Sequence, residues 1–136
     1  MFSVPLAKRF DRIVAVESNP AAARDLEFNI SSRAEAHRGA IEARALDVEH
    51  FLDKFKEKPD LIVADPPRAG LTPAVVQQFA RIKPTRITYV SCEPPTLARD
   101  LAELLKAGYE ISAMHLFDLF PQTFHIETVV LLRRIQ

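Results

Sequence analysis

Apolar residues along this chain form short continuous runs, separated by segments in which they recur with helical spacing. The runs predict strands at residues 12–17, 41–47, 60–65 and 86–92. The segments between and after them predict helices at residues 20–30, 48–55, 73–81 and 94–107. The end of the chain predicts two further strands, which we expect to form a long antiparallel pair, at residues 109–120 and 125–135.

This alternation predicts an α/β fold with a mostly parallel sheet that helices cover on both faces. The closing antiparallel hairpin resembles that of the Rossmann-like methyltransferases that use S-adenosylmethionine. In sheets of this kind, ligands bind beyond the carboxyl ends of the strands. We therefore expect the functional side chains at those ends.

Four charged or reactive residues follow the four predicted strands, namely Glu17, Asp47, Asp65 and Cys92. Glu17 can accept hydrogen bonds from two ribose hydroxyls of a nucleotide, or it can cap the helix that follows. Asp47 can contact an adenine amino group, or it can cap its own helix. The sequence leaves both alternatives open.

Asp65 stands before two prolines, Pro66 and Pro67. The prolines fix the backbone and remove two amide donors, so the carboxylate is held in a defined direction. An aromatic residue after Asp-Pro-Pro would indicate methylation of a base amino group. Arg68 follows here instead, which argues against that substrate.

Cys92 has the chemistry needed to activate a pyrimidine. A thiolate that adds to C6 turns the ring into an enolate, and C5 can then attack a methyl sulfonium. Pro94 or Pro95 suits the first helical position, so Cys92 stands just before a helix N-terminus, whose dipole favours the thiolate. Glu93 opposes this effect, and the alternative is a cysteine that fills apolar space.

A base must remove the C5 proton after methyl transfer, and the start of the last predicted strand offers Glu127 and His125. A carboxylate in a semi-apolar pocket is a suitable general base, which favours Glu127. The alternatives are an exposed strand position for Glu127 and a structural imidazole for His125. We favour the structural interpretation for His125.

Composition limits the other functions. The 136 residues suffice for one domain, and 18 basic residues balance 18 acidic ones, which argues against tight nucleic-acid binding by this chain unaided. One cysteine allows no internal disulfide, and the scattered histidines predict no metal site. No apolar stretch is long enough to span a membrane, and no signal pattern opens the chain, so we expect a cytoplasmic protein.

Three segments together resemble one family, the RNA (uracil-5-)-methyltransferases that form 5-methyluridine in tRNA and rRNA. They are DLIVADPPRAGL, YVSCEPPTLARDL and DLFPQTFHIETVVLL. Their order and spacing also match, and the likeness extends over essentially the whole chain. Cys92 and Glu127 lie in its most specific parts.

The resemblance implies a role for each candidate residue. Cys92 would be the nucleophile and Glu127 the base, and Asp65 would orient the uracil or the methyl donor. Glu17 and Asp47 would contact S-adenosylmethionine. Related enzymes that form 5-methylcytosine in RNA usually carry a second cysteine after the Asp-Pro-Pro strand, and its absence here favours uracil.

The chain departs from the family at its start. The segment FSVPLAKRF resembles the helix that in the family follows a first strand and a glycine-rich turn, whereas the first glycine here is Gly39. The missing strand would lie at the centre of the sheet, between the strands predicted at 12–17 and 60–65, where the cofactor binds. We therefore expect residues 1–136 to be a single, truncated catalytic domain that binds S-adenosylmethionine weakly.

Two functions follow. The first is an RNA methyltransferase acting on tRNA or rRNA with the help of an RNA-binding domain that this sequence lacks. The second is an inactive module that keeps the fold and acts only in binding or association. A nucleotide-binding oxidoreductase is a poor third, because no glycine fingerprint is present. Unpaired strand edges also predict that the chain can form a homodimer.

Overall fold

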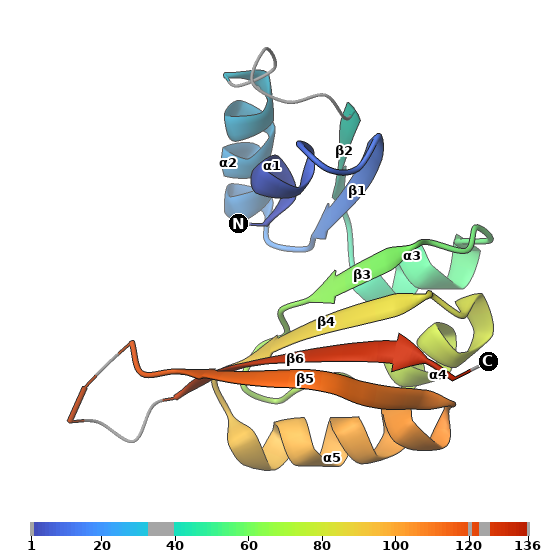
Figure 1. The fold of residues 1–136 in the computed structure, drawn as a ribbon. Coiled ribbons are helices and arrows are strands. Elements are labelled where there is room, and N and C mark those ends of the chain that lie inside the picture. The colour runs from blue at the N-terminus through green and yellow to red at the C-terminus, as the bar shows by residue number, and fades with distance from the viewer. Residues whose placement is uncertain (1, 33–39, 120, 123–125, 136) are drawn as a thin grey trace. The chain divides into compact units, whose positions relative to one another are not determined.

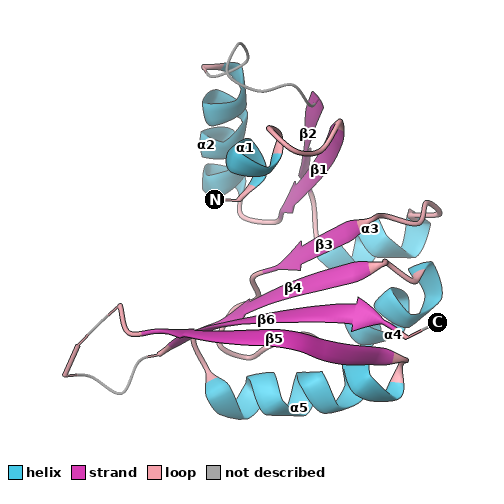
Figure 2. Ribbon diagram, in the orientation of Figure 1, coloured by secondary structure: helices cyan, strands magenta, loops and turns pink. Residues whose placement is uncertain are grey.

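The computed structural model describes residues 2–32, 40–119, 121–122 and 126–135. In chain order, the described elements are α1 Ser3–Leu6, β1 Arg12–Glu17, α2 Pro20–Ser31, β2 Ala40–Ala45, α3 Val48–Lys54, β3 Leu61–Ala64, α4 Pro73–Ile82, β4 Arg86–Ser91, α5 Pro94–Lys106, β5 Tyr109–Phe117 and β6 Glu127–Arg134 (Figures 1 and 2). They form two compact units, Met1–Lys54 and Phe55–Gln136.

The predicted strands and helices are confirmed, with shifts at their ends. The strand expected to reach Asp47 ends at Ala45, because Asp47 caps the helix that follows it. The helix expected to include Phe55 ends at Lys54, and the strand expected to reach residue 120 ends at Phe117. The likeness of FSVPLAKRF to a helix holds for Ser3–Leu6 only.

The first unit pairs β1 with β2 in parallel, from Arg12 opposite Ala40 to Glu17 opposite Ala45. Asn19 begins α2 as expected, since its Oδ1 accepts hydrogen bonds from the amides of Ala21 (2.9 Å) and Ala22 (3.3 Å). Pro20 occupies the start of the helix, where a missing amide proton costs nothing. Most of β1 is half-buried, rather than fully buried on both faces as predicted.

The second unit is a four-stranded sheet in the order β3-β4-β6-β5. β3 and β4 are parallel, and β6 lies antiparallel to both β4 and β5, which confirms the closing hairpin (Figure 1). Figure 2 shows α5 along one face of this sheet. The inner faces alternate with half-buried positions along β4 and β6, and the buried residues are Ile87, Tyr89, Ser91, Thr128, Val130 and Leu132.

The six described strands thus belong to two sheets, β1-β2 and β3-β4-β6-β5. Within the described part of the chain, β1 pairs only with β2, and β3 pairs only with β4. This interruption of the strand order falls where the sequence predicts that the central strand is missing. In the same part of the chain, no helix is both long enough and apolar enough to cross a lipid bilayer.

Candidate active site

The sheet of the second unit brings three candidate residues to one end. Asp65 directly follows β3, Cys92 directly follows β4, and Glu127 begins β6. Ser91 is paired with Thr128, so Cys92 and Glu127 are the next residues of the two neighbouring strands. Since β3 and β4 run parallel with Ala64 opposite Tyr89, Asp65 emerges at the same end.

Cys92 lies in the turn between β4 and α5 and is half-buried, with a free thiol. The turn is held by Ser91, whose Oγ accepts a hydrogen bond of 3.1 Å from the amide of Glu93. The helix begins at Pro94, two residues after the thiol, which confirms the predicted start. Glu93 is the N-cap residue, and its side chain makes no capping hydrogen bond.

Asp65 and Glu127 differ in exposure, since Asp65 is exposed and Glu127 is half-buried. The backbone after Asp65 turns sharply, and the amide of Gly70 donates a hydrogen bond of 2.8 Å to the carbonyl of Pro67. Glu127 is paired with Phe117 of β5 on its other side. The other candidate near it, His125, lies outside the described residues.

Glu17 and Asp47 lie together in the first unit, at the carboxyl ends of β1 and β2. The Glu17 Oε1 atom accepts a hydrogen bond of 2.7 Å from the amide of Asn19. The Asp47 Oδ1 atom accepts hydrogen bonds from the amides of Glu49 (2.8 Å) and His50 (3.3 Å), so Asp47 does cap α3. Each of these hydrogen bonds uses one carboxylate oxygen and leaves the other for a hydroxyl or amino group of a ligand.

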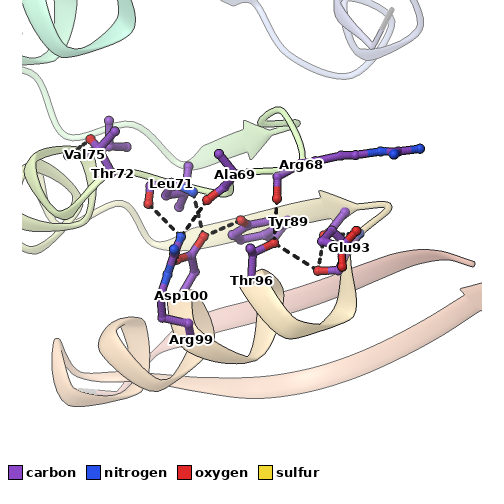
Figure 3. A network of polar contacts seen from close by, with 11 residues as sticks. Arg68, Ala69, Leu71, Thr72, Val75, Tyr89, Glu93, Thr96, Arg99 and Asp100 are labelled. Atoms are coloured by element: carbon purple, nitrogen blue, oxygen red, sulfur yellow. Dashed lines mark hydrogen bonds and ion pairs between the residues drawn. The ribbon is translucent and has the colours of Figure 1, made fainter.

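The sequence reasoning missed a buried carboxylate beside this site. Asp100 of α5 is 2% exposed, and its Oδ2 accepts hydrogen bonds of 2.6 Å from the Tyr89 hydroxyl and 2.6 Å from the Leu71 amide (Figure 3). A signal was present, because Asp100 falls between Leu97 and Leu104 on the apolar stripe of the helix. A charged residue at such a position needs partners inside the protein.

Tyr89 is fully buried in β4. Burial raises the pKa of the Tyr89 hydroxyl well above its ordinary value, and the hydrogen bond to Asp100 and the negative charge of that carboxylate raise it further. The hydroxyl therefore stays protonated and remains a donor to Asp100.

The parallel strands with intervening helices, the antiparallel closing hairpin and the acidic strand ends define an S-adenosylmethionine-dependent methyltransferase fold. The sequence profile described as tRNA (uracil-5-)-methyltransferase matches residues 1–135. The chain belongs to this family.

Individual relatives agree. The chain is 43% identical over 133 residues to an uncharacterized RNA methyltransferase of Thermotoga maritima, covering 96% of this chain and 29% of that protein. It is 36% identical over 140 residues to the 23S rRNA (uracil(1939)-C(5))-methyltransferase RlmD of Salmonella choleraesuis, covering 98% of this chain and 31% of that protein. The chain thus spans about 30% of the length of these relatives.

Solved structures show the same fold. The tRNA (uracil-54, C5)-methyltransferase of Pyrococcus abyssi, in complex with S-adenosyl-L-homocysteine, superimposes with a TM-score of 0.80 at 34% identity. The match covers 96% of this chain and 31% of that one. A precorrin-6y C5,15-methyltransferase of Geobacter metallireducens superimposes with a TM-score of 0.73 over 97% of this chain and 74% of that one, and at 15% identity it shows the fold alone.

Proposed function

We propose that this chain is the catalytic segment of an enzyme that methylates C5 of uracil in tRNA or rRNA, with S-adenosylmethionine as methyl donor. The observation that supports this most is the pairing of Ser91 with Thr128, which makes Cys92 and Glu127 neighbours at the end of the sheet. Asp65 emerges at the same end. A nucleophile, a base and an orienting carboxylate are the groups that C5 methylation needs.

In the proposed mechanism, the Cys92 thiolate forms a bond to C6 of the uracil, and the electrons of the C5–C6 double bond move into an enolate. S-adenosylmethionine supplies the methyl group that C5 then accepts. Glu127 removes the proton from C5, the double bond forms again, and the sulfur–C6 bond breaks, which frees Cys92. Asp65 orients the uracil or the methyl donor during these steps.

Glu17 and Asp47 are the residues of the first unit that we propose to hold the donor. The fit is reasonable for both, because each carboxylate accepts from backbone amides through one oxygen in the hydrogen bonds described above. The other oxygen of Glu17 suits a ribose hydroxyl, and that of Asp47 suits the adenine amino group. We expect RNA to be captured with a further RNA-binding domain, in the cytoplasm.

Uracil is the proposed base because Cys92 is the only cysteine of the chain. The second thiol that we associate with cytosine methylation after the Asp-Pro-Pro strand is missing. The loop after β3 carries Arg68 at the position where an aromatic residue would favour methylation of an amino group.

An RNA oligonucleotide with 5-fluorouridine tests this function, since fluorine at C5 blocks the last step and traps the covalent adduct. We expect a stable adduct in a version extended at the N-terminus by the first strand and glycine-rich turn of the Thermotoga relative. Cys92→Ser should abolish it. An adduct that survives this substitution would remove Cys92 from the mechanism.

The second candidate is an inactive module that acts in binding or association. The observation that favours it is the division of the strands into two sheets, with β1 and β3 each paired on one side within the described residues. Such edges bind further strands, including those of a second copy. Calorimetry should show weak S-adenosylmethionine binding by the chain alone, and sedimentation should show a dimer if the edges associate; micromolar cofactor binding by a monomer would exclude this alternative.

A further inference from the structure

Asp100 connects three parts of the second unit through one carboxylate. Its Oδ2 accepts from Tyr89 in β4 and from the amide of Leu71 in the loop after β3 (2.6 Å each). Its Oδ1 accepts from Arg99, the preceding residue in α5, through Nε (2.8 Å) and Nη2 (2.7 Å). Both oxygens of a nearly inaccessible carboxylate are thus occupied.

The same helix also holds the loop through two other side chains (Figure 3). Arg99 Nη2 donates hydrogen bonds to the carbonyls of Ala69 (2.8 Å) and Leu71 (3.2 Å). Thr96 Oγ1 donates to the carbonyl of Arg68 (2.9 Å). Residues 96, 99 and 100 of α5 therefore bind the backbone of residues 68–71, and we call this set of contacts the α5 clamp.

Gly70 gives an independent sign that the fit is close. Its φ of +78° lies in the left-handed region, and a Cβ at this position would lie 2.4 Å from Asp100 Oδ2 and 2.7 Å from Arg99 Nη2. Any side chain here would displace the loop or the clamp. The loop reaches this distance from α5 only because residue 70 is glycine.

The clamped elements are the ones that carry the candidate chemistry. The loop begins with Asp65, α5 begins two residues after Cys92, and Tyr89 lies three residues before Cys92 on β4. A buried charged group contributes little net stability compared with apolar side chains of similar size, but it fixes the geometry of its partners. The polar contacts of Asp100 therefore favour a positioning role.

We propose that the α5 clamp, centred on Asp100, positions the Asp65 loop relative to the Cys92 turn for uracil methylation. This inference rests on the proposed function and deepens it. Asp100 acts through the loop and the turn rather than by touching substrate, so it is a positioning residue.

Asp100→Asn tests the clamp, because it keeps the size of the side chain and removes its charge. Glu103→Gln is the matched control, since Glu103 lies on the same helix and is exposed in its ion pair with Lys106. In the present chain, we measure hydrogen exchange of the Leu71 amide and alkylation of Cys92 by iodoacetamide, which no other cysteine complicates. We expect Asp100→Asn to raise the Leu71 exchange rate roughly 5- to 30-fold, with Glu103→Gln unchanged.

A purely stabilising role predicts a different result. It would raise exchange equally throughout residues 55–136, whereas the clamp predicts a rise confined to residues 65–72 and 91–93, with a changed Cys92 alkylation rate. Uniform exchange, or an unchanged alkylation rate, would overturn the proposal. Thr96→Val serves if Asp100→Asn does not fold, because it removes only the hydrogen bond to Arg68 and should give a smaller change in the same direction.

Activity then separates this proposal from the proposed function. In the extended version that forms the 5-fluorouridine adduct, Asp100→Asn should slow adduct formation with little change in RNA affinity. If the unsubstituted version forms no adduct, the proposed function fails, while exchange and alkylation still decide the clamp. If it forms the adduct and Asp100→Asn does so equally fast, the clamp proposal fails alone.

Discussion

Ser91 of β4 pairs with Thr128 of β6, and both side chains are buried on the same face of the sheet. One residue further along the two strands, Cys92 and Glu127 are therefore neighbours. Residues directly opposite one another in an antiparallel pair have Cα atoms about 4.5 to 5.5 Å apart. That separation suits two groups that act on the same pyrimidine ring.

A disulfide tests this relationship directly. Glu127→Cys should form an intramolecular disulfide with Cys92 under mild oxidation, because a Cα separation of about 5 Å falls within the range that disulfides span. Leu131→Cys is the control, since it is half-buried in the same strand but pairs with Thr88. Mass spectrometry and thiol titration give the result. A free thiol pair in Glu127→Cys would show that the ladder does not continue to Cys92.

Glu127→Gln should separate the first and last steps of the proposed reaction. The amide keeps the shape of the carboxyl group but accepts no proton, so Cys92 can add to uracil while the release step stalls. With unmodified uridine RNA, methyl donor and the extended version, we expect turnover to fall about 10²- to 10⁴-fold, the usual contribution of a general base. A covalent protein–RNA species should accumulate on a denaturing gel. Loss of turnover without this species would place Glu127 before the addition step.

The strands and helices could be predicted because apolar runs and helical spacing reflect burial, which the structure preserves. The ends were less predictable, because hydrogen bonds decide them. Asp47 illustrates this, since its Oδ1 caps α3 and ends the strand earlier than the apolar pattern indicates. Asp65 and Cys92 were found at strand ends because they follow the runs directly.

Asp100 could not be recognised as a site residue from spacing alone. Its importance depends on Leu71, which is far from it in sequence, and on Tyr89, whose hydroxyl the apolar pattern of β4 conceals. The pairing of Ser91 with Thr128 was also beyond the sequence, because register depends on the whole hairpin. Family likeness, rather than pattern, pointed to Glu127.

The Tyr89 hydroxyl makes the stability of the second unit depend on alkaline pH. Its pKa is raised by burial and by Asp100, so the folded state favours the protonated form. The stability it contributes is fully present below about pH 10, the ordinary value for tyrosine, and is lost as pH rises towards the folded pKa. Tyr89→Phe should cost about 1.5 to 3 kcal/mol at neutral pH, as expected for a hydrogen bond to a charged group.

Urea unfolding of both proteins at about pH 8 and about pH 11, on either side of the ordinary tyrosine pKa, measures this dependence. The difference in unfolding free energy between the wild type and Tyr89→Phe should shrink at the higher pH. Thr96→Val is the control, because it removes a hydrogen bond of the same clamp without removing a titrating group. A Tyr89→Phe difference that stays constant between the two pH values would contradict a buried, protonated phenol.

Gly70 and Gly108 offer a matched test of how closely the loop approaches α5. Both have positive φ, +78° and +90°, so alanine is strained at either position. A Cβ at Gly108 meets nothing within 4 Å, whereas one at Gly70 meets the Asp100 carboxylate at 2.4 Å. Gly108→Ala should therefore cost the backbone strain alone, about 1 kcal/mol or somewhat more, and Gly70→Ala should cost more than that.

A double-mutant cycle isolates the contact. Asp100→Ala removes the atoms that a new Cβ would strike, so Gly70→Ala should be less harmful in that background, with a coupling energy of about 0.5 to 3 kcal/mol. Gly108→Ala should show no coupling to Asp100→Ala, because no clamp atom lies near it. Chemical denaturation of the four proteins in each cycle gives both values. Equal costs at the two glycines, with additive effects in both cycles, would mean that the loop does not depend on Asp100 for its position.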